Sequence, residues 1–121
     1  MLAKTLKWPF LVVLISGTLH FTLIAIFPNL QNFYTPPVLG FVQLAIGIWV
    51  GYASIHNGGN FLTAIMYAAI LGLFPLIVYP LSFGLILGED LHTTMLAGVF
   101  GLANFVFGSL VSGGFATSMK E

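Results

Sequence analysis

The chain contains no cysteine. Disulfide bonds, thiolate catalysis, iron–sulfur clusters and thiolate zinc sites are therefore excluded within it. Charge is almost as scarce, because three basic and three acidic residues make up only 5% of the 121 positions. A typical soluble domain carries about 25% charged residues. Six formal charges are too few to solubilise a globule of this size, so the shortage excludes a soluble protein.

The few charges are also missing where chemistry would need them. No residue from Trp8 to Gly88 carries a formal charge, and the net charge of the chain is zero. A neutral chain offers no basic surface that would attract nucleic acid. Proton-coupled transport generally uses an ionisable relay inside the membrane, and only His20 is available for one. We therefore expect no enzyme activity from this chain by itself.

What the chain has instead is apolar sequence. Hydrophobic residues make up 59% of it, and the mean hydropathy is +1.07. The uncharged stretch is several times longer than the ~20 residues that one membrane crossing needs. We predict one all-α integral membrane domain, residues 1–121, with transmembrane helices at about 8–27, 38–56, 61–80 and 91–114. The basic start resembles a signal peptide, but its apolar run reaches Phe27 without a cleavage site, which predicts a retained first span.

Turn and capping residues separate these four spans. Asn57, Gly58, Gly59 and Asn60 form a short, strongly punctuated turn, which predicts that the second and third helices make an antiparallel hairpin. Asn60 is positioned to cap the third span, and Asp90 to cap the fourth. Thr35 followed by Pro36 predicts the start of the second helix, after a polar and aromatic surface loop at 29–37.

The third apolar run is too long for one simple crossing. Residues 61–88 would give roughly 42 Å of straight helix, against a hydrocarbon core of about 30 Å. Pro75 and Pro80 lie inside it, and each removes a backbone donor and clashes with the preceding turn. We predict a kink near Pro75 and a break near Pro80, with a short interfacial or re-entrant piece at 81–88. The alternative is one long, tilted helix with a proline kink.

The charges predict the orientation of the bundle. Four crossings place both termini on the same side of the membrane. The positive-inside rule assigns the lysines to the cytoplasmic side, which leaves Glu89 and Asp90 outside. A prokaryotic cell membrane or an organellar inner membrane is the expected location. The charged residues are Lys4, Lys7, Glu89, Asp90, Lys120 and Glu121.

Small residues recur at helical spacing in every span after the first. Lipid supplies no hydrophobic drive between helices, so close backbone contact must replace it. One interpretation is that these faces are seams inside an ordinary bundle. The other, which we favour because four short helices have much surface and little interior, is that at least one face meets another chain. The predicted packing residues are Gly40, Gly47, Gly51, Ala64, Ala68, Gly72, Ala97, Gly101, Gly108 and Ser112.

One imidazole and two amides lie deep within the predicted spans, those of His20, Gln43 and Asn104. Counted from the outer helix ends, His20 is ~10 Å deep and Gln43 ~8 Å deep, so the two share a layer and can hydrogen-bond. Asn104 is ~20 Å deep, level with Ser16 and Gly72. We favour interhelical hydrogen bonds that fix helix register. The alternative is a polar pathway, or a group next to a quinone, formed by His20, Gln43 and Asn104.

The histidines do not predict a cofactor site. A bis-histidine haem needs two ligands at one depth, whereas His20, His56 and His92 fall in different layers. No cluster of His, Asp and Glu has metal-ligand spacing either. We therefore predict no cofactor apart from bound lipid. A haem or quinone contact shared with another subunit stays open.

Two functions remain. The first is a small accessory or structural subunit of a larger membrane complex, such as a respiratory, photosynthetic or oxygenase assembly. Its partners would be lipids and other membrane subunits. The alternative is a homo-oligomeric channel or carrier for a small neutral solute, with a polar layer of His20, Gln43 and Asn104. Pro75 and Pro80 would then form a broken helix that lines the path.

Overall fold

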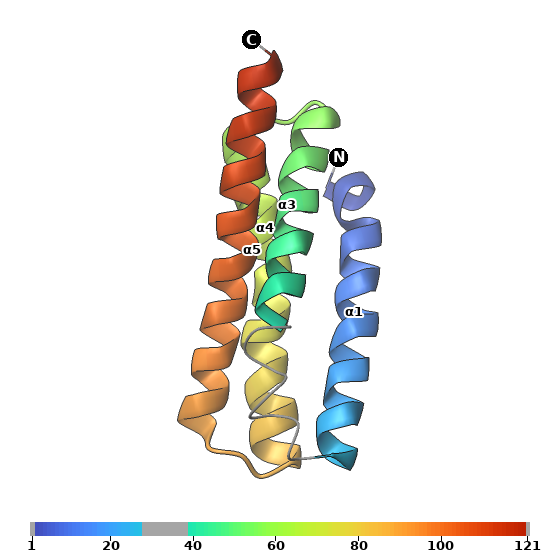
Figure 1. The fold of residues 1–121 in the computed structure, drawn as a ribbon, viewed down its shortest axis with the longest axis vertical. Helices are drawn as coiled ribbons and strands as arrows, with labels where there is room; N and C mark the ends of the chain where they lie inside the picture. The colour runs from blue at the N-terminus through green and yellow to red at the C-terminus, as the bar shows by residue number, and fades with distance from the viewer. Residues whose placement is uncertain (1, 28–38, 121) are drawn as a thin grey trace.

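A computed structural model describes residues 2–27 and 39–120, and Figure 1 shows them as a bundle of long helices. The elements are α1 (Leu2–Ile26), α3 (Gly40–His56), α4 (Phe61–Tyr79), the π-helix η2 (Pro80–Ile86) and α5 (Leu91–Lys120). The described residues contain no strand, so the all-α prediction is confirmed for them. The loop expected at 29–37, with its helix start at Thr35 and Pro36, lies outside the described residues.

Three helices are long and apolar enough to cross a membrane. They are α1, the continuous segment Phe61–Ile86 and most of α5, with 25, 26 and 29 residues. α3 has 17 residues, which is the short end of the range for a spanning helix. The start of α1 and the end of α5 lie toward one end of the bundle, and the connection between η2 and α5 lies at the other (Figure 1).

The predicted turn at 57–60 and the predicted helix cap at Asn60 are confirmed. The Asn60 side chain accepts a hydrogen bond from the Thr63 backbone at 2.9 Å, and the Thr63 hydroxyl accepts one from the Asn60 backbone at 3.3 Å. This reciprocal capping box satisfies two donors that the first turn of α4 leaves unpaired. Gly58 has φ +95°, a conformation that favours glycine, and it turns the chain from α3 into α4.

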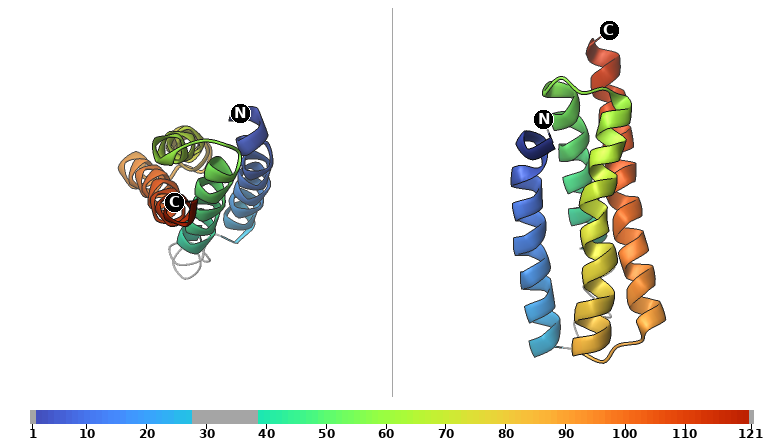
Figure 2. Two further views of the ribbon diagram at one scale, coloured as in Figure 1. Left: turned by 90° about the horizontal axis from the view of Figure 1, so that it is seen from above. Right: turned by 180° about the vertical axis from the view of Figure 1, so that it is seen from behind.

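The predicted break near Pro80, with a separate short piece at 81–88, is wrong. Helix continues from Phe61 to Ile86 without a break, as the right-hand view of Figure 2 shows. At Pro80 the pattern changes from α-helix to a seven-residue π-helix. The Ser82 hydroxyl donates to the Val78 carbonyl at 2.6 Å. Side-chain hydroxyls and local π adjustments of this kind let apolar helices tolerate proline. The kink itself stays a prediction.

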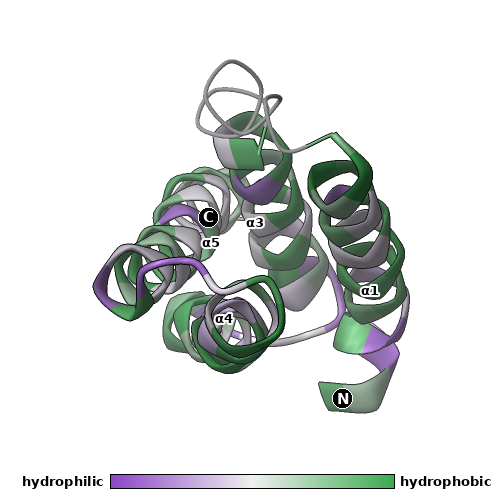
Figure 3. Cartoon of the chain, turned by 90° about the horizontal axis from the view of Figure 1, so that it is seen from below, coloured by the Kyte–Doolittle hydropathy of each residue, from purple (hydrophilic) through white to green (hydrophobic). Residues whose placement is uncertain are grey.

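Helices α3, α4 and α5 form the tightly packed part of the bundle. α1 lies beside α3 and α4 (Figure 2) and packs less extensively than they pack with one another. The main core contains Leu6, Val13, Ile46, Val50, Ala68, Leu71 and Phe105. The outer surface is also apolar: Phe41 is 73% exposed and Phe100 65%, and the hydrophilic residues gather mainly at the connections and the N-terminal turn (Figure 3). Such a surface suits contact with lipid chains.

Candidate functional site

The glycines of α3 and α5 lie against each other's backbone. A Cβ atom built on Gly108 would lie 2.5 Å from the Leu44 carbonyl oxygen, and one built on Gly47 would overlap the Phe105 backbone. A Cβ built on Gly51 would overlap the Ser112 hydroxyl and would lie 2.5 Å from the Ser109 carbonyl oxygen. No side chain fits at these positions, so glycine permits the close approach of α3 and α5.

The remaining small residues extend this contact to α4. Ala64 and Ala68 are fully buried, and the Ser109 hydroxyl donates to the Ala64 carbonyl at 2.7 Å. A Cβ on Gly72 would overlap Leu102 of α5, and one on Gly101 would lie 2.8 Å from Gln43 Nε2. Gly40 lies near Asn104, Ser112 is buried, and Ala97 is exposed. This geometry supports the seam interpretation, because the small residues of these helices mainly face one another.

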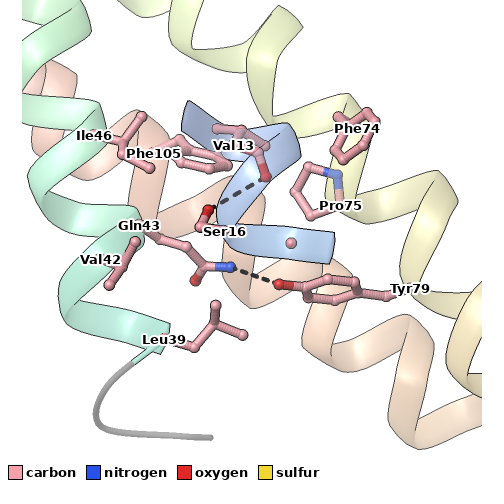
Figure 4. Close-up of a pocket in the computed structure, with 11 residues that line it drawn as sticks. Val13, Ser16, Leu39, Val42, Gln43, Ile46, Phe74, Pro75, Tyr79 and Phe105 are labelled. Atoms are coloured by element: carbon pink, nitrogen blue, oxygen red, sulfur yellow. Dashed lines mark hydrogen bonds between the residues drawn. The ribbon is translucent and has the colours of Figure 1, made fainter. Parts of the chain in front are cut away.

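A hydrogen-bonded triad joins the same three helices. Gln43, only 5% exposed, lies in the first turn of α3. Its Oε1 accepts from Asn104 Nδ2 at 3.0 Å, and its Nε2 donates to Tyr79 Oη at 3.3 Å. Figure 4 shows the Gln43 amide nitrogen directed at the Tyr79 hydroxyl. A single amide therefore links α3, α4 and α5.

The partners in this triad differ from those counted along the sequence. Asn104 bonds Gln43 rather than lying level with Ser16 or Gly72, and the Ser16 hydroxyl donates to Val13 O within its own helix. His20 forms no hydrogen bond with Gln43. The cause is an offset between helices: α3 begins at Gly40, beside Asn104, so its first turn is already deep in the bundle.

Tyr79 was not predicted as a site residue, because it was grouped with the aromatic residues and not with the polar ones. Its hydroxyl and its position beside Pro80 were the available signals. In the described part of the chain this hydroxyl accepts from Gln43 and donates to no protein atom. A cavity of about 20 Å³ next to it is lined by Ser16, Gln43, Phe74 and Pro75, among others (Figure 4). That is room for about one water molecule.

A second cavity lies near the η2–α5 connection, and we call it the Glu89 pocket. It has a volume of about 50 Å³. His20 lies against it, is only 9% exposed, and packs its ring 5.4 Å from that of Phe83. Its imidazole has no hydrogen-bond partner among the described residues. The lining residues are His20, Leu39, Tyr79, Phe83, Glu89, Thr93, Thr94 and Ala97.

In the described part of the chain, apolar side chains follow the triad along the core. Val50, Ala68 and Phe105 lie next along the core, each at most 2% exposed. Beyond them, a cavity of about 200 Å³ is lined by Tyr52, His56 and Met119, among others. Apolar packing therefore separates the two ends of the bundle in this conformation.

Asp90 caps α5 at the edge of this region. Its Oδ2 accepts from the Thr93 backbone at 3.1 Å and from the Thr93 hydroxyl at 2.8 Å. These hydrogen bonds stabilise the carboxylate and lower the pKa of Asp90 below its ordinary value of 3.8. Because the folded-state pKa is the lower one, the cap contributes its full stability above the unfolded pKa and loses it as pH falls through the folded value.

The Thr93 amide resonance reports this titration. In acid we expect it to shift with a midpoint below 3.8, because protonation of Asp90 weakens the acceptor. Asp90→Asn keeps a capping oxygen and removes the titration. The measurement is an amide proton and nitrogen NMR titration of the detergent-solubilised chain. A midpoint at or above the ordinary value contradicts the cap.

The arrangement defines an all-helical bundle whose long apolar helices are compatible with a membrane protein. Among the described residues no group of three His, Asp or Glu side chains is placed to hold a metal ion. His56 is exposed and stacks on Tyr52 at the end of α3, and His92 is exposed at the start of α5. No protein-family model, curated protein or solved structure matches this chain, so function is argued from its own geometry.

Proposed function

We propose that this chain is a four-span accessory subunit of a larger membrane complex. It acts without catalysis, through helix packing and lipid contact, with both termini on the cytoplasmic side of a prokaryotic or organellar inner membrane. The exposed apolar surface of α1 is the observation that supports this role. Only six of its 25 residues are buried, although it is one of the three helices that are long and apolar enough to cross a membrane. The small-residue seams of α3, α4 and α5 are closed within the chain, so α1 is the helix with most surface for a partner.

Copurification from native membranes tests the proposal. The full chain, tagged and extracted in mild detergent, is expected to carry other membrane proteins in a stoichiometric assembly by native mass spectrometry. Ile15→Ala with Leu19→Ala removes exposed bulk from α1 and is expected to release the partners. Leu62→Ala with Ile77→Ala makes the matched change on the exposed face of α4. A chain that runs as a lone monomer and retains nothing contradicts the accessory role.

A second candidate is a homo-oligomeric carrier for a small neutral solute. The observation that favours it is the chain of donors from Asn104 to Gln43 to Tyr79 beside a cavity of about 20 Å³. Because apolar residues close the other half of the bundle, the helices would have to move during transport. Liposome flux that disappears in Asn104→Leu or His20→Leu supports this candidate. Flux that survives both substitutions counts against it.

A further inference from the structure

The lining of the Glu89 pocket is largely apolar, and three of its polar groups, the Glu89 carboxylate and the Thr93 and Thr94 hydroxyls, offer hydrogen-bond acceptors. The Thr93 hydroxyl donates to Asp90 at 2.8 Å and the Thr94 hydroxyl to the Leu91 carbonyl at 2.9 Å. Their hydrogens are thus engaged, which leaves their oxygen lone pairs as acceptors. In the described part of the chain, no donor forms a hydrogen bond with the Glu89 carboxylate. The backbone N–H of Glu89 donates to the Phe83 carbonyl. A ligand with several N–H donors matches this lining.

The charge distribution selects a cation. Glu89 and Asp90 lie together at the end of the bundle formed by the η2–α5 connection. Lys4 and Lys7 lie in the first turns of α1, toward the opposite end (Figure 1). Within a partly enclosed site such a charge acts more strongly than in water. The local potential therefore favours a positively charged ligand.

Aromatic rings form one wall of the pocket. The rings of Tyr79 and Phe83 pack edge to face, with centroids 5.6 Å apart, and both line the cavity. Aromatic faces attract cations, more strongly where water is excluded. Phe83 belongs to the π-helix η2, a rare conformation that is often found at functional sites.

His20 supplies an independent indication of a ligand. Its imidazole is buried, lines the pocket and has no hydrogen-bond partner among the described residues. A buried polar group without a protein partner costs free energy unless something else pairs with it. A neutral imidazole offers one acceptor nitrogen, which adds to the acceptors of Glu89 and Thr94.

We propose that the Glu89 pocket binds a primary ammonium group. Its three N–H donors match the Glu89 carboxylate, the threonine oxygens and the His20 nitrogen. The cavity, at about 50 Å³, holds about four water-sized groups at 10–15 Å³ each. Ethylammonium or the amine end of an ethanolamine group fits this volume, whereas a quaternary ammonium has no N–H donor to offer the lining.

The ammonium group can come from a free amine or from a lipid headgroup. A groove of about 450 Å³ adjoins the pocket and shares Leu39, Thr93 and Ala97 with it. Leu96 and Phe100 make its wall apolar, so it suits a lipid chain. Both sources present the same N–H donors to Glu89, and the composition of the bilayer distinguishes them.

The test uses the full chain in phosphatidylcholine nanodiscs, whose headgroup has no N–H donor. Ethylammonium chloride is titrated while the ¹⁵N resonances of the His20 imidazole are recorded. We expect a saturable shift with ethylammonium and none with tetramethylammonium at the same ionic strength. Repeating the titration in phosphatidylethanolamine nanodiscs identifies the source: weaker apparent binding supports the lipid headgroup, and unchanged binding supports a free amine.

Two charge variants complete the design. Glu89→Gln is expected to weaken ethylammonium binding about tenfold, the effect of losing one charge-assisted hydrogen bond. Lys4→Gln changes the net charge by one unit toward the opposite end of the bundle, at a residue that does not line the pocket, and is expected to change binding by less than about twofold. Equal losses in the two variants, or no saturable shift in the unmodified chain, overturn the proposal.

Discussion

Alanine at Gly108 lowers the free energy of unfolding by about 3 kcal/mol, the upper part of the range for overpacking a tight interior. The added Cβ would lie 2.5 Å from the Leu44 carbonyl oxygen and 2.9 Å from the Ile48 nitrogen. Both are backbone atoms of α3, so no side-chain rotation relieves the overlap. The two helices have to separate, and the contacts around Phe105 loosen with them.

Gly17→Ala is the matched control for this substitution. It is the same change inside a helix, but nothing lies within 4 Å of a Cβ built on Gly17. Alanine favours helix over glycine by about 1 kcal/mol, so this variant is expected to be as stable as the unmodified chain or slightly more stable. Far-UV circular dichroism during denaturation in mixed detergent micelles gives the comparison. If both variants unfold at the same midpoint, the α3–α5 backbone contact is not the basis of stability.

The sequence predicted the local features of this fold well, because they depend on neighbouring residues. The hairpin turn at Gly58 and the caps at Asn60 and Asp90 each involve residues within four positions of one another. The small residues of α3 and α5 were also recognised from their helical spacing. Spacing gives the face of a helix but not its partner. The sequence alone therefore did not distinguish a face that meets another chain from a seam within the chain, such as the one between Gly47 and Phe105.

The site was harder to predict because it depends on helix register. Depth counted from the end of each span assumes that all helices begin at one level. α3 begins at Gly40, beside Asn104 of α5, and this offset brings Asn104 to Gln43. Likewise, Pro80 indicated a departure from α-helix, but only the structure shows a π-helix that continues the segment. That geometry carries Phe83 to His20, a contact with no signal in the sequence.

Leucine at Gln43 is the second change expected to have a large effect, a loss of about 1–3 kcal/mol in the free energy of unfolding. Leucine keeps most of the side-chain volume but removes both interhelical hydrogen bonds, and it leaves the Asn104 amide and the Tyr79 hydroxyl without a protein partner. Tyr79→Phe removes one bond only and should cost less. Thr22→Val is the control, since its exposed hydroxyl bonds only the Thr18 carbonyl of its own helix among the described residues.

A double-mutant cycle isolates the bond between the two amides. Because Asn104→Leu and Gln43→Leu delete the same hydrogen bond, their combination is expected to cost less than the sum of the single changes. The expected difference is about 0.6 kcal/mol and at most about 1.7 kcal/mol, the average and the maximum for interhelical hydrogen bonds in a membrane protein. Denaturation in mixed micelles measures all four proteins. Strictly additive effects would mean that the two amides do not interact, and the triad would then not determine the register of α3 against α5.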